Sequence, residues 1–169
     1  QTPNVSESSA SVRILGTVKN ESMHTYKIRV RHIIYDKNRN KVSEKLDTYK
    51  IKPDAALSIK RDLPEVTNPC LWSPENPYLY TLCSVIEDIS SGKVLQQTES
   101  VFGFRWFSVD NTGFYLNGKK IKLRGAARHQ DYAGLGIAIP SEINRNDMEA
   151  LKDMGANFVR ISHYPQDKE

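Results

Sequence analysis

The chain has 169 residues, of which 38% are hydrophobic and 26% charged, a composition typical of a soluble globular protein with room for one complete domain and part of another. The net charge of +4 comes from 24 basic and 20 acidic residues interleaved along the whole length, which argues against a nucleic-acid-binding protein. No apolar run approaches the roughly 18 residues that would predict a membrane-spanning helix.

The first two thirds of the chain show short apolar-polar alternations that turn-forming residues interrupt every ten or so positions. This rhythm predicts an antiparallel, immunoglobulin-like β-sandwich. In the second expected strand, alternation places Ile28, Val30 and Ile34 on a buried face and Lys27 and Arg29 on a solvated one. The expected strands are 11–19, 24–36, 41–51, 56–63, 78–87, 93–100 and 102–109.

The two cysteines, Cys70 and Cys83, lack the short spacing and neighbouring histidines of a metal site. We expect free thiols rather than a disulfide. Prolines at 74 and 77 restrict the backbone after Trp72, and the size of Trp72 suits packing at one end of the sandwich better than stacking on a sugar.

Beyond residue 110 the pattern changes from strands alone to strand, helix, strand. The sequence predicts a strand at 120–125, a helix at 141–154 and a second strand at 157–161. Ser141 is the expected N-cap of the helix and Gly155 its end. Two strands joined by a helix predict a parallel pair with a crossover connection.

Polar clusters follow both of these expected strands, where ligands gather in α/β folds. Two histidines and two arginines would then meet on one rim, roughly 5–10 Å apart given the spacing of neighbouring strands. Arginine pairs with carboxylates and histidine donates to hydroxyl groups, so the clusters indicate a binding site, although histidines that only cap strand ends are the alternative. The residues are Arg128, His129 and Asp131 in the first cluster, and Arg160 and His163 in the second.

Four segments carry a resemblance to glycoside hydrolase family 2, in the order in which that family has them. Residues 157–165, Asn-Phe-Val-Arg-Ile-Ser-His-Tyr-Pro, resemble its first signature, although Ile161 stands where a small or polar residue is more usual. Residues 71–80, with Trp-Ser-Pro-Glu-Asn-Pro, resemble a segment of its sandwich domain. Residues 102–105 and 114–119 resemble the exit from that domain and the bridge to its barrel.

The resemblance implies a mainly β fragment of a larger enzyme. Residues 1–110 would be the immunoglobulin-like sandwich and residues 111–169 an incomplete (β/α) barrel opening, the first part of a TIM barrel. Family members are retaining glycosidases that use two glutamates, and retaining hydrolysis needs two carboxyl groups about 5–5.5 Å apart. Both glutamates would belong to later barrel strands, so we expect no catalytic residue in this fragment and no activity from it alone.

The resemblance also assigns roles to the polar clusters. His129 and His163 match residues that bind the sugar and stabilise the transition state, and Arg160 matches one that orients the nucleophile. Arg128 and Asp131 are included as neighbours on the same loop. The sequence around His129 looks nearest to the β-galactosidases, so the expected substrates are terminal β-galactosides, with β-glucuronides as the alternative.

Other expectations are more general. Asn20-Glu21 matches the dipeptide that carries the family's acid/base glutamate, but it falls in a turn between sandwich strands, and we reject it. The sequence itself contains no identifiable set of metal ligands and no cofactor motif. The resemblance implies that the parent enzyme uses Mg or Na. It also implies a carbohydrate partner and a homo-oligomer. The interleaved charges and the absence of a long apolar run predict no nucleic-acid or membrane partner. The compartment stays open among periplasmic, secreted and cytoplasmic. A non-catalytic carbohydrate- or protein-binding sandwich, or a spacer between domains, are the competing functions.

Overall fold

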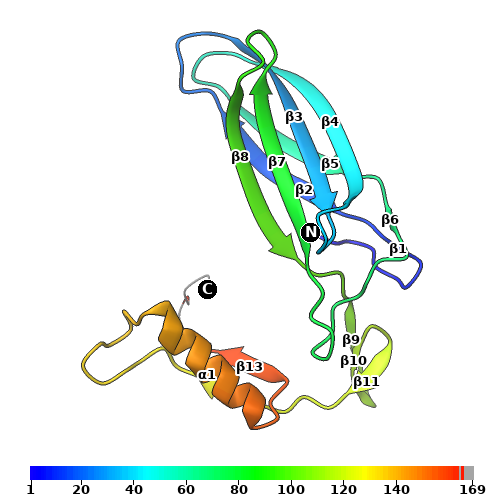
Figure 1. The fold of residues 1–169 in the computed structure, drawn as a ribbon, viewed down its shortest axis with the longest axis vertical. Helices are drawn as coiled ribbons and strands as arrows, with labels where there is room; N and C mark the ends of the chain where they lie inside the picture. Colours follow the sequence, from blue (N-terminus) through cyan, green and yellow to red (C-terminus); the bar gives the residue numbers. More distant parts are fainter. Residues whose placement is uncertain (164, 166–169) are drawn as a thin grey trace. The chain divides into compact units, whose positions relative to one another are not determined.

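The computed structural model describes residues 1–163 and residue 165 (Figure 1). The chain divides into two compact units. The first consists of Gln1–Phe107 with Leu116–Gly118, and the second of Ser108–Tyr115 with Lys119–Glu169. The fold class agrees with the sequence prediction, since a β-sandwich precedes a strand-helix-strand unit.

The first unit is built from two facing antiparallel sheets. The larger sheet has the strand order β4-β3-β7-β8, and the smaller one pairs β2 with β5. A short pair, β1 with β6, lies at one end. The bounds are β1 Ser9–Ala10, β2 Arg13–Lys19, β3 Tyr26–Tyr35, β4 Lys41–Ile51, β5 Ala56–Asp62, β6 Val66–Thr67, β7 Tyr80–Asp88 and β8 Val94–Phe102.

The core lies between the sheets, and its residues come from the alternating positions that the sequence predicts. On β3, Ile28, Val30 and Ile34 are buried whereas Lys27 is exposed. Ile34 and Phe104 are fully buried, in a cluster with Tyr80. Both Cys70 and Cys83 are free thiols, as expected.

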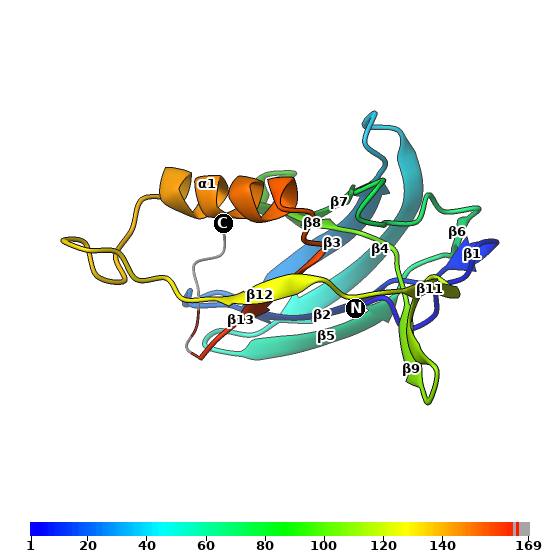
Figure 2. The ribbon, with the colours of Figure 1, turned by 90° about the horizontal axis from the view of Figure 1, so that it is seen from below.

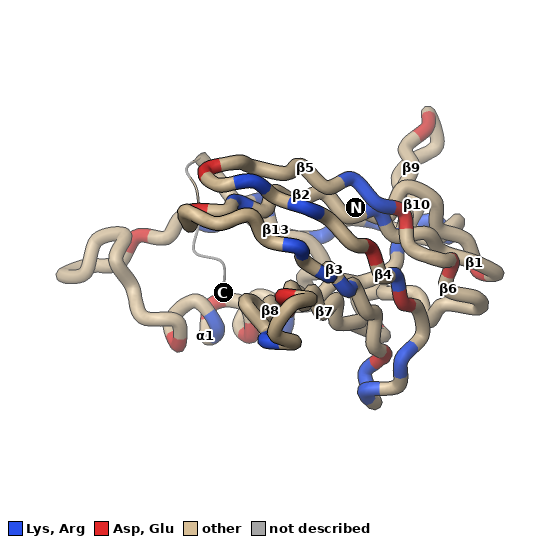
Figure 3. Tube along the Cα trace, turned by 90° about the horizontal axis from the view of Figure 1, so that it is seen from above, with Lys and Arg blue, Asp and Glu red and all other residues tan. Residues whose placement is uncertain are grey.

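The charges on this unit are mixed in sign, which agrees with the interleaving in the sequence. Figure 3 shows Lys and Arg interspersed with Asp and Glu over the sheets, without a large region of one sign. Cross-strand ion pairs join Arg13 to Asp62 at 2.7 Å and Arg29 to Glu87 at 3.0 Å. No described helix is long and apolar enough to cross a membrane.

The strand expected at 102–109 is wrong. The sheet ends at Phe102, and Phe104 then forms an isolated bridge to Leu71. A Cβ at Gly103 would lie 2.8 Å from the Cβ of Trp72, so only glycine permits this close approach. A separate three-stranded sheet follows, with the order β11-β10-β9. Its strands are β9 Phe107–Asp110, β10 Gly113–Leu116 and β11 Lys119–Ile121.

The second unit contains the predicted parallel pair, β12 (Gly125–Arg128) and β13 (Phe158–Ile161), joined by α1 (Ser141–Asp153). Figure 2 shows α1 lying along one side of this pair. The strand expected at 120–125 is misplaced, because residues 119–121 belong to the three-stranded sheet and the parallel strand begins at Gly125.

The helix ends agree with the prediction at one end only. Gly155 follows α1 with a φ of 82°, the left-handed conformation expected after a helix. The N-cap is Pro140, with extended backbone and no side-chain cap, and Ser141 is already the first helical residue. Proline suits this position because its restricted φ is compatible with extended backbone.

Candidate functional site

Two histidines meet where the parallel strands end. His129 follows β12 directly, and His163 lies two residues after β13, whose register pairs Arg128 with Ile161. The two imidazole rings have their centroids 5.7 Å apart and are inclined by 71°, an edge-on contact. Both residues are exposed. The carboxyl ends of the strands therefore present two adjacent imidazoles, within the roughly 5–10 Å that strand spacing suggested.

The two arginines lie on opposite faces of the strand pair. Arg128 contacts Asp147 on α1, so its side chain lies on the helix side of β12. Arg160 pairs in register with Ala127, the residue before Arg128, and side chains alternate between faces along a strand. Arg160 therefore lies on the face away from α1, where it is exposed. The expectation that both arginines would meet on one rim is wrong.

Asp147 holds Arg128 with two hydrogen bonds and also receives one from Tyr132. The Nε and Nη2 atoms of Arg128 donate to Oδ2 of Asp147 at 2.9 and 2.7 Å, and the Tyr132 hydroxyl donates to Oδ1 at 2.7 Å. The Tyr132 hydrogen bond, followed by Arg128, lowers the pKa of Asp147, and the same hydrogen bond raises the pKa of Tyr132. The cluster attaches β12 to the helix.

The loop after His129 is fixed by Gln130. Gln130 is buried, and its Nε2 donates to the carbonyl of Ile137 at 2.9 Å. Between them the chain turns back at Tyr132 and Gly136, which form a bridge. Asp131, a predicted site residue, is exposed on this loop.

Asn157 holds the chain that enters β12. Its Oδ1 accepts from the backbone N–H of Arg124 at 2.9 Å, and its Nδ2 donates to the carbonyl of Lys122 at 3.1 Å. Its own backbone N–H donates to the carbonyl of Arg124 at 2.8 Å. The first residue of the 157–165 motif thus has a structural role. Tyr164, in the same motif, lies outside the described residues.

Sequence reasoning missed Asp147, which holds Arg128, and Tyr132, which donates a hydrogen bond to Asp147. In the sequence, Asp147 is one of several charged residues on the expected helix, and nothing local distinguishes it from a solvent-exposed carboxylate. For the rejected dipeptide, the structure agrees with a turn. Nδ2 of Asn20 donates to the carbonyls of His24 and Ile51, and Lys19 lowers the pKa of Glu21 through a hydrogen bond, the opposite of what a general acid needs.

Within the described part of the chain, no group of three or more His, Cys, Asp or Glu side chains could hold a metal ion. The side chains near the strand ends carry imidazole and guanidinium groups, which donate hydrogen bonds to hydroxyls and carboxylates.

Fold and site together define a class of protein: one in which a β-sandwich is followed by a parallel strand-helix-strand unit, the unit from which (β/α) barrels are built, with polar side chains at the carboxyl ends of its strands. Comparison with known families identifies it further. The sequence model "Glycosyl hydrolases family 2" matches residues 1–105, and "Glycosyl hydrolases family 2, TIM barrel domain" matches residues 107–169. The chain belongs to glycoside hydrolase family 2.

Relatives with two activities resemble the chain. A putative β-glucuronidase of Formosa agariphila is 41% identical over 99% of the chain and 19% of its own length. A β-galactosidase of Thermoanaerobacterium thermosulfurigenes is 32% identical over 99% of the chain and 23% of its own length. The crystal structure of a Bacteroides uniformis β-glucuronidase superposes with a TM-score of 0.96 at 38% identity, covering 99% of this chain and 20% of that one. The chain spans about a fifth of the length of these relatives.

Proposed function

We propose that the longer protein to which this chain belongs is a retaining β-glycosidase that removes a terminal β-linked sugar, and that His129, His163 and Arg160 form part of its sugar-binding rim. The observation that carries this proposal is the 5.7 Å contact of two exposed imidazoles at the ends of paired barrel strands. Barrel enzymes bind their substrates at this end.

Each group has a chemical role that fits its position. The imidazoles donate hydrogen bonds to sugar hydroxyls, and such bonds stabilise the transition state when they strengthen as charge develops at the anomeric carbon. Arg160 lies on the face away from α1, where its guanidinium fork would orient a carboxylate nucleophile from a later strand. Arg128 acts from the other face, because its contact with Asp147 fixes the strand that carries His129.

The 169-residue chain alone is expected to be inactive. Retaining hydrolysis needs one carboxylic acid with a raised pKa and a carboxylate nucleophile about 5–5.5 Å away. Asp147 is the carboxylate that touches the predicted site residue Arg128, and its pKa is lowered, so it would not deliver a proton. The resemblance to the family also supports the proposal that the longer protein uses Mg or Na.

Two sugars are candidates for the substrate. The residues around His129 favour β-galactosides by their resemblance to galactosidases. The 41% and 38% identities to proteins named β-glucuronidases favour β-glucuronides. Parallel assays of the longer protein with p-nitrophenyl β-galactoside and β-glucuronide separate the two, because kcat/KM for the true substrate should be higher by about two orders of magnitude or more.

Substitution of the histidines tests the site itself. In the longer protein, His129→Ala and His163→Ala should each lower kcat/KM on the preferred substrate by about a hundredfold, the size of effect found when a transition-state hydrogen bond is removed. His24→Ala is the matched control, because His24 is an exposed histidine of the sandwich. Activity of both variants equal to that of the control would refute the proposed site.

The sandwich is proposed to position neighbouring domains rather than to bind sugar. Its conspicuous aromatic residue, Trp72, is only partly exposed, packs against Gly103, and is covered by the Arg105 guanidinium at 4.5 Å from the ring centroid. Calorimetric titration of the longer protein with galactose or glucuronate should therefore give the same affinity for Trp72→Phe as for the unchanged protein.

A further inference from the structure

Asn117 and Gly118 form the turn between β10 and β11. These two residues alone separate the strands, and both have positive φ values, 51° and 75°. Asparagine followed by glycine is the preferred sequence for such a type I′ turn, because both residues tolerate the left-handed backbone that the turn requires. The sequence of the turn therefore suits its geometry.

The same pair of residues is chemically labile. The backbone nitrogen of Gly118 can attack Cγ of Asn117, which closes a succinimide ring. The side-chain nitrogen then leaves as ammonia and takes the proton of the attacking N–H with it. Water opens the ring at either carbonyl, which gives aspartate, or isoaspartate in which the backbone runs through the side chain. Glycine favours the attack because it has no side chain to hinder it. Asn117 is the only asparagine in the sequence that a glycine follows.

Three hydrogen bonds hold Asn117 in place. Its Oδ1 accepts from the backbone N–H of Trp106 at 3.1 Å, and its Nδ2 donates to the carbonyl of Trp72 at 2.9 Å. Its own backbone N–H donates to the carbonyl of Trp106 at 2.9 Å. Both ends of the side-chain amide are thus bonded. The amide carbon can reach the nitrogen of Gly118 only if these side-chain bonds break and the turn opens.

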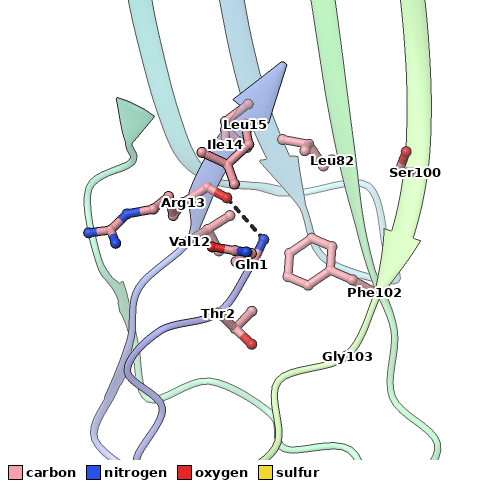
Figure 4. Close-up of a pocket in the computed structure, with 10 residues that line it drawn as sticks. All are labelled: Gln1, Thr2, Val12, Arg13, Ile14, Leu15, Leu82, Ser100, Phe102 and Gly103. Carbon is pink, nitrogen blue, oxygen red and sulfur yellow. Dashed lines mark hydrogen bonds between the residues drawn. The ribbon is translucent and has the colours of Figure 1, made fainter. Parts of the chain in front are cut away.

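The carbonyl of Trp72 is itself fixed. The chain leaves β8 at Phe102 and passes through Gly103 (Figure 4). A Cβ at Gly103 would lie 2.8 Å from the Cβ of Trp72, so Trp72 packs directly on this segment. The backbone N–H of Trp72 donates to the carbonyl of Phe104 at 2.8 Å, and Phe104 is fully buried. The acceptor for the Asn117 amide therefore belongs to the packed end of the sandwich.

We propose that Asn117 is a site of spontaneous deamidation that the fold keeps closed, and that the modified turn does not close again in the same way. Deamidation replaces Nδ2 by an oxygen, so a carboxylate would face the carbonyl of Trp72, two acceptors with no proton between them. Isoaspartate in addition lengthens the backbone of the turn. Each molecule that opens and reacts is therefore permanently marked, and the rate of marking follows the fraction of molecules with an open turn.

The first half of the proposal is tested on the longer protein, incubated either folded or in urea in the same mildly alkaline buffer. Trypsin cuts after lysine and arginine and releases residues 106–119 as one peptide, which contains both Asn111 and Asn117. Mass spectrometry after chromatography distinguishes asparagine, aspartate and isoaspartate at each position. In urea Asn117 should react faster than Asn111, which threonine follows.

In the folded protein, Asn117 should react about tenfold more slowly or less than in urea, because opening the turn breaks two side-chain hydrogen bonds. Asn111 is exposed and is the internal control, whose rate should differ much less between the two states. Equal rates at Asn117 in the folded and unfolded protein, or no reaction at Asn117 in urea, would overturn the proposal.

Asn117→Asp in the longer protein tests the second half. With a carboxylate beside the carbonyl of Trp72 the turn opens, and the amide of Trp106 should exchange its hydrogen about tenfold faster or more than in the unchanged protein. Asn111→Asp is the matched control, because it makes the same change at an exposed residue between β9 and β10, and it should leave exchange at Trp106 unchanged. Exchange at Trp106 that is equal in the two variants would mean that the closed turn accepts the carboxylate, and the proposal would be wrong.

Discussion

Phe104 is expected to be the residue on which the sandwich depends most, although it belongs to no strand. It is fully buried, and its ring lies 4.8 Å from that of Tyr80 and 5.2 Å from that of Phe102, both centroid to centroid. Phe104→Ala removes the ring, and the surrounding strands cannot close the space fully. The free energy of unfolding should fall by about 3–5 kcal/mol, the usual loss for a buried phenylalanine. This is a large part of the roughly 5–15 kcal/mol of a typical domain.

Urea denaturation followed by tryptophan fluorescence measures this loss, since Trp72 lies in the same unit. Phe107→Ala is the matched control, because Phe107 is 78% exposed and three residues along the chain. Its free energy of unfolding should change by no more than about 0.5 kcal/mol. A loss below about 1 kcal/mol for Phe104→Ala, or equal losses for both variants, would refute the packing argument.

Three further predictions concern polar groups. Asp147→Asn should destabilise the helix-strand unit by about 1–2 kcal/mol, because the partly buried Arg128 loses its charged acceptor. Asp153→Asn, at the exposed end of the helix, is the control and should leave stability unchanged. The rate of amide hydrogen exchange in α1 measures both effects. Burial lowers the pKa of His32, so on acidification the unfolded chain takes up a proton at this residue before the folded chain does. The free energy of unfolding should therefore decrease as the pH falls below about 6.5. His32→Gln should abolish this dependence on pH, measured as the urea midpoint between about pH 5 and 8. Asn20→Ala should lower the free energy of unfolding by about 1–3 kcal/mol in the same assay, since buried carbonyls lose their donor, and Asn20→Ala behaving like a neutral surface variant would contradict this.

The sandwich strands could be predicted from the sequence because burial on one side imposes a period of two. On β3 the positions of Ile28, Val30 and Ile34 suffice to define the inner face. The same rule fails after Phe102. Phe102 and Phe104 keep the period of two, but the sheet has already ended at Phe102. What ends the strand is the close packing of Gly103 on Trp72, a contact over thirty residues in sequence that no local pattern contains.

The first parallel strand was misplaced for a related reason. Alanine is a poor strand former, so Ala126 and Ala127 favour a loop, and the expected strand ends at Gly125. In the fold a glycine is required at the start of β12, because a Cβ at Gly125 would lie 1.7 Å from the carbonyl oxygen of Phe158. Tertiary contact with β13 thus outweighs intrinsic propensity.

The candidate site was predictable in its location but not in the direction of its side chains. Chain order alone placed His129 and His163 at neighbouring strand ends. Chain order could not show that the side chains of Arg128 and Arg160 lie on opposite faces, since both residues stand beside polar motifs. Their separation follows from the register of β12 and β13, which pairs Arg160 with Ala127, so that Arg128 lies toward the helix and Arg160 away from it.

This alternation divides the strand residues by role. The side chain on the helix side, Arg128, is committed to Asp147 and holds the secondary structure together. The side chain on the other face, Arg160, is exposed and lies where a complete barrel would enclose its interior. Substitution of Arg128 should therefore act through stability, and its damage should be relieved at lower temperature. Substitution of Arg160 in the longer protein should lower kcat without changing the unfolding temperature, and an Arg160→Ala variant that loses both together would remove the distinction.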